Sequence, residues 1–341
     1  MLKIKKQVDL SRYNTLKISV KAAYFAIIKS ETDLAEAYIW AKDKGLSVFV
    51  LGGGSNVLFS HNIKALVLKN EIKGVSVIKE TAASAWLEAR SGEAWSTLVN
   101  FAIERNWGGM ENLYYVPGTV GAAPVQNIGA YGVELKDVFV SLRAFDLQTG
   151  KVKIFNKEEC KFAYRDSVFK HKYKGRYFIL SITVKLSKQA KLKLDYGDIK
   201  LKLKEQGIKK PKIRQLAEII RQIRDSKLPN PAELANAGSF FKNPEVSLSA
   251  FKKIQGRFPE IKFFPSAKAG KIKIPAGWLI EQVGLKGKRF GSVAMYEKQA
   301  LILVNYGGAS AKQILTHVQR VQKAVEQKFA IKIEPEVNII K

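Results

Sequence analysis

The apolar positions near the N-terminus follow a strand–helix–strand order. Residues 16–29 and 46–51 have the composition of strands, and the helix between them is predicted to begin near Ser30. Ser30 and Asp33 have the spacing of a capping pair, and Gly45 is a typical stop signal. The chain is therefore predicted to start with a β-α-β unit.

A glycine-rich loop, GGGSN at 52–56, follows the second of these strands. Its consecutive glycines allow backbone N–H groups to face phosphate oxygens without obstruction by Cβ atoms. A Rossmann-type dinucleotide fold is excluded, since Val57 stands where the third glycine of G-x-G-x-x-G belongs. In addition, VLFS at 57–60 continues as a strand instead of opening a helix. The loop is a candidate pyrophosphate cradle, and a tight β-turn explains it about as well.

The middle of the chain alternates between sheet-like and helical patterns. Residues 64–90 have short strand patterns, and Trp95–Asn106 has the pattern of an amphipathic helix. Residues 138–186 alternate apolar and polar positions in short runs, which predicts an antiparallel sheet. Between that helix and that sheet, residues 107–137 contain six glycines and two prolines, which forbid a regular helix. The many small residues of this loop favour a role in binding.

The C-terminal half has longer helical patterns. A helix is predicted over 212–226, and KLPNP at 227–231 indicates a domain boundary. A short helix with proline in its first turn is predicted over 275–287. Apolar residues spaced along 314–329 predict a long amphipathic helix. The chain then ends in an extended segment, in which Pro335 indicates an edge strand.

Charge raises one further function class. The 341 residues contain 58 Lys+Arg against 30 Asp+Glu, a formal net charge of +28, which suggests nucleic-acid binding as a hypothesis. The lysines alternate with apolar residues, as at 185–214, and no zinc-finger spacing or aromatic RNP-type motif accompanies them. We therefore predict a lysine-rich surface that attracts small anions, and no nucleic-acid partner.

Other kinds of site are excluded by residue usage. A single cysteine, Cys160, excludes a disulfide framework and a thiolate metal cluster. The three histidines, His61, His171 and His317, lack metal-ligand spacing. No apolar stretch is long enough to span a bilayer, and the N-terminus lacks the apolar core of a secretory signal. We predict a cytoplasmic protein without a metal site.

A few polar side chains interrupt apolar surroundings. Arg165, in FAYRDSVFK, is either a surface arginine paired with Asp166 or a clamp for a carboxylate. Ser239, in NAGSFFKNP, is either a hydroxyl in a dry pocket or a turn residue, and no G-x-S-x-G motif supports it as a nucleophile. Glu334 and Glu336 are predicted to lie on the same side of an extended segment, where solvent exposure is the default.

Several of these segments occur together in one protein family. The segments are GGGSNVLF, PGTVGAAPVQNIGAYGVELKD, YRDSVFK, NAGSFFKNP, PAGWLIEQVGLKG and EPEV, in this order and over nearly the whole chain. Together they resemble bacterial UDP-N-acetylenolpyruvoylglucosamine reductases, flavoenzymes that make UDP-N-acetylmuramate for peptidoglycan. LDYGDI at 194–199 and the chain length are similar to the family's longer type, whose extra loop would close Tyr196 over the substrate.

The resemblance implies a fold class and a division into domains. The implied protein is α+β, with an FAD-binding fold of the vanillyl-alcohol-oxidase (PCMH) type and a separate α+β substrate-binding domain. Two FAD-binding subdomains would comprise residues 1–70 and 71–225. The substrate domain would comprise residues 226–325, and residues 326–341 would return as a strand to the flavin region.

The resemblance also implies the residues of the site. The implied catalytic residues are Arg165, Ser239 and Glu336. The implied FAD-binding residues are Gly52, Gly53, Gly54, Ser55, Asn56, Pro117, Gly118, Thr119, Gly121, Ala122, Gln126, Asn127, Gly129, Ala130, Tyr131, Gly132 and Tyr164. The implied substrate-binding residues are Tyr196, Arg224, Lys227, Asn243 and Gln282.

The implied chemistry explains the three catalytic residue types. NADPH would reduce FAD, and a hydride would then pass to the vinyl carbon of UDP-N-acetylglucosamine enolpyruvate that is distal to the carboxylate. Negative charge would build on that carboxylate, where Arg165 and a protonated Glu336 would stabilise it. Ser239 would then protonate the α-carbon. We expect a monomer that acts on this substrate with FAD and NADPH.

Two departures and two rival functions accompany this interpretation. Asn338 stands where the family more often has arginine, and Tyr114 and Tyr115 stand where smaller residues are common. One rival is another FAD-dependent oxidoreductase of the same fold, and the catalytic trio argues against it because an oxidase protonates no carbanion. The other rival is a nucleic-acid-binding protein, which would be colourless and whose affinity for nucleic acid would fall steeply with salt.

Overall fold

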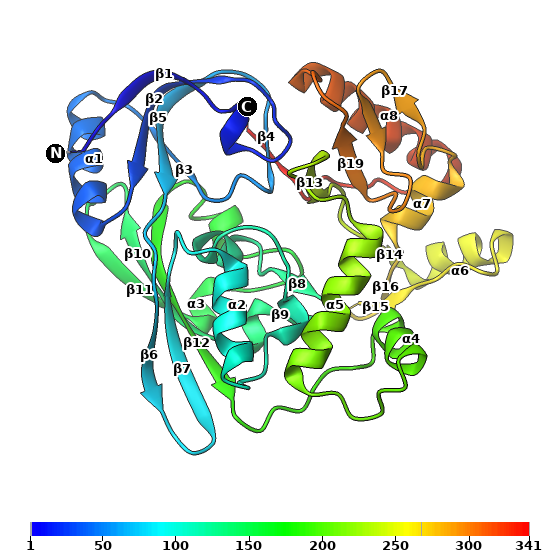
Figure 1. The fold of residues 1–341 in the computed structure, drawn as a ribbon. Coiled ribbons are helices and arrows are strands. Elements are labelled where there is room, and N and C mark those ends of the chain that lie inside the picture. Colours follow the sequence, from blue (N-terminus) through cyan, green and yellow to red (C-terminus); the bar gives the residue numbers. More distant parts are fainter. Residues whose placement is uncertain (1, 267, 341) are drawn as a thin grey trace. The chain divides into compact units, whose positions relative to one another are not determined.

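The computed structural model describes residues 2–266 and 268–340, and the chain divides into two compact units (Figure 1). Unit 1 contains the chain up to Val8, Lys21–Gly54 and Ile63–Ser226. Unit 2 contains Asp9–Val20, Ser55–Asn62 and the chain from Lys227 onward. The chain thus passes between the units several times, and each unit is built from segments far apart in the sequence.

The first layer of unit 1 is a four-stranded sheet with one helix. Its strands are, in spatial order, β1 (Lys5–Asp9), β2 (Lys21–Ile28), β5 (Ile63–Asn70) and β3 (Val48–Leu51). β2 and β3 both pair with β5 in parallel, as a β-α-β start requires. Helix α1 (Glu31–Asp43) has Ser30 as its N-cap. The Ser30 hydroxyl accepts from the Asp33 N–H, and the Asp33 carboxylate accepts from the Ser30 N–H. The predicted capping pair is therefore confirmed.

The second layer of unit 1 is an antiparallel sheet. Its strands are, in spatial order, β11 (Val152–Asn156), β10 (Phe139–Asp146), β12 (Tyr177–Ser187), β7 (Ser84–Arg90) and β6 (Val75–Glu80). The antiparallel pairing predicted for 138–186 is confirmed. Helix α2 (Trp95–Glu104) buries Trp95, Leu98 and Ala102 in the same core as the sheet.

The remaining elements of unit 1 are mostly short. They are α3 (Lys157–Cys160), α4 (Gly197–Glu205), α5 (Ile213–Lys227), the two-residue strands β8 (Gly129–Ala130) and β9 (Val133–Glu134), and the 3-10 turns η2 (Glu111–Leu113), η3 (Val120–Val125), η4 (Leu135–Asp137) and η5 (Val168–Lys170). The predicted helix over 212–226 is confirmed, and its apolar face packs against α4. Residues 107–137 contain no long helix, as their glycines and prolines predict.

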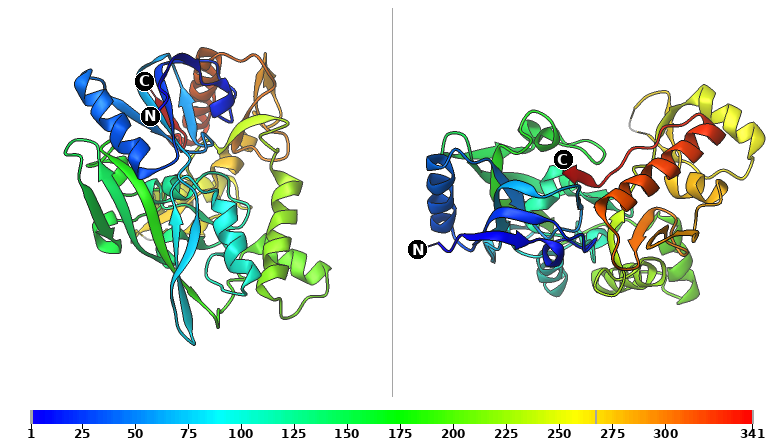
Figure 2. Two further views of the ribbon diagram at one scale, coloured as in Figure 1. Left: turned by 60° about the vertical axis from the view of Figure 1, so that its left-hand side comes forward. Right: turned by 90° about the horizontal axis from the view of Figure 1, so that it is seen from above.

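Unit 2 is a second α+β body. Its strands are β13 (Ala235–Ser239), β19 (Ile302–Asn305), β18 (Val293–Met295) and β17 (Arg289–Phe290) in one sheet, β14 (Glu245–Ser247), β16 (Lys271–Lys273) and β15 (Phe264–Pro265) in another, and the parallel pair β20 (Asn338–Ile340) and β4 (Val57–Phe59). Its helices are η1 (Ser11–Tyr13), α6 (Leu248–Arg257), α7 (Ala276–Gln282) and α8 (Ala311–Phe329). The long orange-red helix α8 is clearest in the right-hand view of Figure 2.

Two strand predictions are corrected by the structure. Residues 16–20 are not strand, because this segment packs into unit 2 and hydrogen-bonds irregularly, with the Asn305 amide donating to the Leu16 carbonyl. Leu16 and Ile18 are buried there, which explains their strand-like alternation. Pro335 lies outside the last strand, which begins at Asn338. The exclusion of a Rossmann fold is confirmed, since strand β4 follows the glycine loop.

A buried histidine in α8 gives unit 2 a testable dependence on pH. His317 is 1% exposed and packs against the ring of Phe290. Burial, with a smaller contribution from Arg320, lowers the pKa of His317 to about 4. As the pH falls from about 6.5 towards 4, His317 therefore becomes protonated in the unfolded chain but stays neutral in the folded chain. This difference lowers the free energy of unfolding by at most about 3 kcal/mol at the acidic end.

We expect His317→Gln to remove this dependence. Thermal unfolding at pH 7 and pH 4.5 should show a smaller acid-induced drop in Tm for the variant than for the unmodified chain. His61→Gln, at an exposed position, is the matched control and should keep the full drop. An unchanged drop in His317→Gln would contradict the assignment.

Candidate functional site

Two glycine-rich segments of unit 1 pack directly against each other. A Cβ atom added to Gly52 would lie 2.7 Å from Thr119 Oγ1, and one added to Gly53 would lie 3.2 Å from the Gly118 Cα. Gly54 has φ +67°, which favours glycine at that position. The predicted cofactor segments 52–54 and 117–119 are therefore adjacent, and the lack of a Cβ atom at 52 and 53 allows this close approach.

Thr119 carries a buried polar atom without a partner. Its Oγ1 has no hydrogen bond among the described residues, and the residue is only 9% exposed. A buried hydroxyl normally finds a partner, so its position beside the two glycines fits a bound group with polar atoms. The structure thus supports the prediction that these segments form a cradle for a phosphate-bearing cofactor.

Sequence reasoning missed one basic residue beside this cradle. Lys69, in strand β5, donates a hydrogen bond from Nζ to the Gly52 carbonyl at 2.9 Å. Burial lowers the pKa of Lys69 below its ordinary range. The available signal was a lysine near the end of the apolar run ALVLKN, where a solvated lysine is the default. The remaining two residues of the predicted loop, Ser55 and Asn56, belong to unit 2, where the Asn56 carbonyl accepts from the backbone N–H and side chain of Asn338.

The loop after η3 folds back as a small hairpin. β8 and β9 pair through a two-residue turn in which Tyr131 has φ +48° and Gly132 has φ +80°. Two consecutive positive φ angles are typical of a type I′ turn. Upstream, Gly121 donates its N–H to the Ser91 carbonyl, which fixes the loop on the turn after β7. The loop is thus held at both ends by its backbone.

Arg165 occupies a tight turn that faces this loop. The backbones of Ala163 and Asp166 exchange two hydrogen bonds, of 3.1 and 3.2 Å, and Arg165 between them has φ +52°. Its Nη2 donates to the Gly129 carbonyl at 2.6 Å, and a Cβ added to Gly129 would lie 2.9 Å from Nη1. The carboxylate of Asp166 contacts His171 Nε2 at 2.8 Å. The arginine is therefore fixed on the predicted cofactor loop, while Asp166 has another partner.

A buried arginine lies near two tyrosines of the predicted site. Arg224, on α5, is buried near the phenol of Tyr131, and its Nε has no hydrogen-bond partner among the described residues. Burial lowers the pKa of Arg224, and burial raises the pKa values of Tyr131 and Tyr196. The rings of Tyr131 and Tyr196 meet edge to face, with centroids 5.3 Å apart. By contrast, Arg221 on the same helix is paired with Glu218 and Asp225. Arg224 is thus a buried cation whose Nε is a candidate donor to an anion.

Ser239 and Glu336 are brought together in unit 2. The backbone N–H of Glu336 donates to the carbonyl of Phe240, next to Ser239, at 2.7 Å. Ser239 ends β13 and is exposed, while Glu336 is half-buried. Phe240 and Phe241 are buried in the core of unit 2, and the two alternatives for Ser239 stay predictions. Arg165 belongs to unit 1.

The other predicted substrate residues of unit 2 have structural partners. The Asn243 side-chain oxygen accepts from the backbone N–H of Ala276 at the start of α7, which leaves its amide NH₂ group for other contacts. The Gln282 carbonyl, at the end of α7, accepts from Lys328 Nζ. Lys227 is the last residue of α5.

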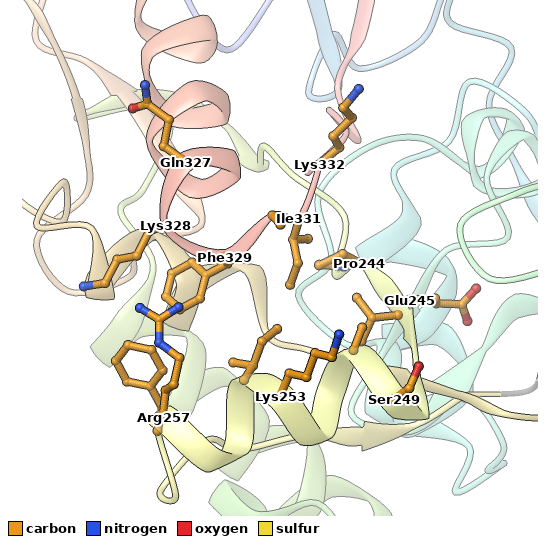
Figure 3. Close-up of a pocket in the computed structure, with 15 residues that line it drawn as sticks. Pro244, Glu245, Ser249, Lys253, Arg257, Gln327, Lys328, Phe329, Ile331 and Lys332 are labelled. Atoms are coloured by element: carbon orange, nitrogen blue, oxygen red, sulfur yellow. The ribbon is translucent and has the colours of Figure 1, made fainter.

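A cavity of about 670 Å³ lies elsewhere in unit 2, between α6 and the end of α8 (Figure 3). It is lined by cationic side chains such as Lys253 and Arg257 and by apolar ones such as Phe258 and Phe329. None of the predicted site residues lines it. Among the described residues, no group of three or more His, Cys, Asp or Glu could hold a metal, and no helix has the length and apolarity to cross a membrane.

Sequence comparison matches both parts of the chain. A profile of the C-terminal domain of UDP-N-acetylenolpyruvoylglucosamine reductase matches residues 230–340, and a profile of an FAD binding domain matches residues 22–156. The UDP-N-acetylenolpyruvoylglucosamine reductase of Flavobacterium johnsoniae is 45% identical over 340 residues. The alignment covers 99% of this chain and 100% of that relative.

Two solved structures are similar in fold. The reductase of the same description from Thermus caldophilus has a TM-score of 0.68 at 23% identity, with both chains covered completely. 6-Hydroxy-D-nicotine oxidase from Arthrobacter nicotinovorans has a TM-score of 0.53 at 14% identity, over 97% of this chain and 87% of that one. Together with the FAD binding profile, this likeness confirms the predicted α+β class with an FAD-binding fold of the vanillyl-alcohol-oxidase type.

Proposed function

The chain belongs to the UDP-N-acetylenolpyruvoylglucosamine reductase family, and from that premise we propose which of its residues bind FAD, bind substrate and carry the chemistry. It is an FAD-dependent oxidoreductase that uses NADPH to reduce UDP-N-acetylglucosamine enolpyruvate to UDP-N-acetylmuramate for peptidoglycan. The observation that carries this function is the 45% identity to a reductase over the full chain. The rival FAD-dependent function has only fold-level likeness in its favour.

The FAD site is proposed to be the cradle of unit 1. Gly52 and Gly53 leave room beside Thr119, whose buried hydroxyl would donate to an oxygen of the cofactor. Lys69 holds the Gly52 carbonyl and would add positive charge beneath a pyrophosphate. The remaining predicted residues of 117–132 would contribute backbone groups, and FAD when bound supplies the hydride. Ser55 and Asn56 remain predictions carried by the resemblance.

Substrate binding is proposed to rest in unit 1 on Arg224. Arg224 is buried beside Tyr131 and Tyr196, so a diphosphate there would satisfy both its charge and its free Nε. Tyr196 would close over the nucleotide, as in the longer type of the family. Lys227, Asn243 and Gln282 stay substrate-binding predictions carried by the resemblance.

The chemical steps are proposed to use three side chains. Arg165 would hold the carboxylate of the enolpyruvyl group, because its guanidinium is fixed on the Gly129 carbonyl and cannot lose its charge. Glu336 would add a hydrogen bond to the same carboxylate. Ser239 would give its proton to the α-carbon, which becomes basic once a hydride has reached the neighbouring carbon.

Several finer features remain proposals. We propose a monomer in the cytoplasm, and a longer-type family member with Tyr196 on the closing loop. The four-part domain division and the absence of a nucleic-acid partner likewise stay predictions. Asn338 bonds to the Asn56 carbonyl, so at this position, where the family more often has arginine, the residue supports the glycine loop.

The function is tested by spectrum and turnover. Purified protein is expected to show flavin absorption bands, and NADPH oxidation should depend on added UDP-N-acetylglucosamine enolpyruvate. A protein that binds FAD but shows no such dependence would contradict the reductase function. A protein without flavin bands that cannot be reconstituted with FAD would contradict the cofactor as well.

A further inference from the structure

Alternate residues of the cofactor loop bind the turn that carries Arg165. The Val125 carbonyl accepts from Ser167 Oγ at 2.6 Å, and the Gly129 carbonyl accepts from Arg165 at 2.6 Å. Between them, Asn127 donates from Nδ2 to the Ala163 carbonyl at 3.0 Å. Three successive alternate positions of the loop thus contact both sides of one short turn. Only Asn127 does so through its side chain, which makes its contribution accessible to mutation.

Both Nδ2 hydrogens and the Oδ1 atom of Asn127 form hydrogen bonds within the protein. It is 0% exposed, its second Nδ2 hydrogen goes to Glu134 at 3.1 Å, and its Oδ1 accepts from the Lys136 N–H at 3.0 Å. An amide has two donor hydrogens, so no donor is left for a cofactor. The resemblance implies that Asn127 binds FAD, but these hydrogen bonds indicate a structural role for its side chain.

The turn needs such support because its backbone is strained. Arg165 adopts φ +52°, in the left-handed region that long side chains seldom occupy, whereas Asn127, with φ +46°, is a residue type that tolerates this region. A side chain on a strained turn keeps its position only when the surroundings fix it. The hydrogen bond to Ala163 fixes the residue that opens the turn, two positions before Arg165.

We propose that Asn127 is a positioning residue that holds the Arg165 turn against the cofactor loop. This role rests on the proposed function, in which Arg165 binds the substrate carboxylate. Loss of Asn127 would let the guanidinium move relative to the carboxylate, while the backbone groups that contact FAD stay anchored through Gly121 and Ser91. The expected defect therefore lies in the substrate step and not in cofactor affinity.

A double-mutant cycle with Arg165→Ala tests this role. The measured quantities are the rate at which substrate reoxidises the reduced enzyme and the FAD dissociation constant of the apoprotein. Asn127→Ala is expected to slow reoxidation by about 100-fold, the effect of a small misplacement of a reacting group, with FAD affinity changed less than about threefold. In the Arg165→Ala background the same change should slow the step less than about twofold, because the two residues act as one unit.

Asn14 supplies the matched control. It is a buried asparagine of unit 2 with the same three hydrogen bonds, two donated to the Leu10 and Ile18 carbonyls and one accepted from the Ile18 N–H. Asn14→Ala should lower Tm about as much as Asn127→Ala and leave the reoxidation rate near that of the unmodified enzyme. If Asn127→Ala does not fold, Asn127→Gly replaces it, since glycine readily adopts the φ of +46° at this position and likewise cannot donate to Ala163.

The possible outcomes distinguish the proposed function of Arg165 from the positioning role of Asn127. If Arg165→Ala alone leaves reoxidation unchanged, the proposed function of Arg165 fails, and the positioning role falls with it. If Arg165→Ala slows reoxidation, and Asn127→Ala slows it by the same factor with and without Arg165, then Asn127 acts independently and the positioning role is wrong. A large rise in the FAD dissociation constant would identify Asn127 as a cofactor residue and also overturn the proposal.

Discussion

Replacing Ser239 by alanine should slow the reduction of UDP-N-acetylglucosamine enolpyruvate by about 10²–10⁴-fold, the usual contribution of a positioned acid. Reduction of the flavin by NADPH should remain nearly unchanged, because that half-reaction protonates no carbon. Ser239 is exposed at the end of β13, so its removal should not disturb the core. Anaerobic stopped-flow measurement of the two half-reactions gives both rates separately.

Two further variants serve as controls for Ser239→Ala. Ser239→Cys retains a transferable proton and should recover part of the lost rate. Ser249→Ala, at an exposed serine on α6 of the same unit, should leave both half-reactions unchanged. Equal losses in the two half-reactions of Ser239→Ala would refute the proton-donor role.

Gly121→Ala should weaken FAD binding by about 10- to 100-fold. A Cβ atom there would lie 2.6 Å from Ser91 Cβ and 3.1 Å from the Ser91 carbonyl oxygen, so the loop must move away from the turn after β7. Overpacking of this kind costs about 1–3 kcal/mol, and roughly 1.4 kcal/mol corresponds to a tenfold change in affinity. Titration of the apoprotein with FAD, followed by the change in flavin fluorescence, measures the effect.

The control for this variant is another glycine with free space around it. Gly256 lies in helix α6, and a Cβ atom added there meets nothing within 4 Å. Gly256→Ala should therefore leave FAD affinity unchanged and should not destabilise the protein, since alanine favours helix. FAD affinity in Gly121→Ala equal to that of Gly256→Ala would mean that residues near 121 do not form the cofactor site.

Elements with local signals could be predicted from the sequence. Helix α1 starts at Ser30 because Ser30 and Asp33 cap each other within one turn. Helix α5 follows from the spacing of its apolar residues, which needs no knowledge of what they pack against. The strand that replaces a Rossmann helix after the glycine loop was equally visible, since Val57 removes the required third glycine.

Features that depend on distant partners could not be predicted. Residues 16–20 alternate like a strand, but the Leu16 carbonyl accepts from the Asn305 side chain, and the preceding Thr15 carbonyl accepts from the Asn236 N–H. Lys69 looks like an ordinary solvated lysine until the fold places it under Gly52. Likewise, Asn127 and Ala163 are 36 residues apart in the chain, so their hydrogen bond has no local signal.

The most direct test of the account is the oxidation of NADPH-reduced enzyme by UDP-N-acetylglucosamine enolpyruvate in D₂O, without oxygen. We predict one equivalent of UDP-N-acetylmuramate per flavin, with solvent deuterium at the α-carbon of the product. Ser239→Ala should form this product far more slowly, although its flavin is reduced at the normal rate. Failure of the substrate to reoxidise the unmodified enzyme would contradict the central claim.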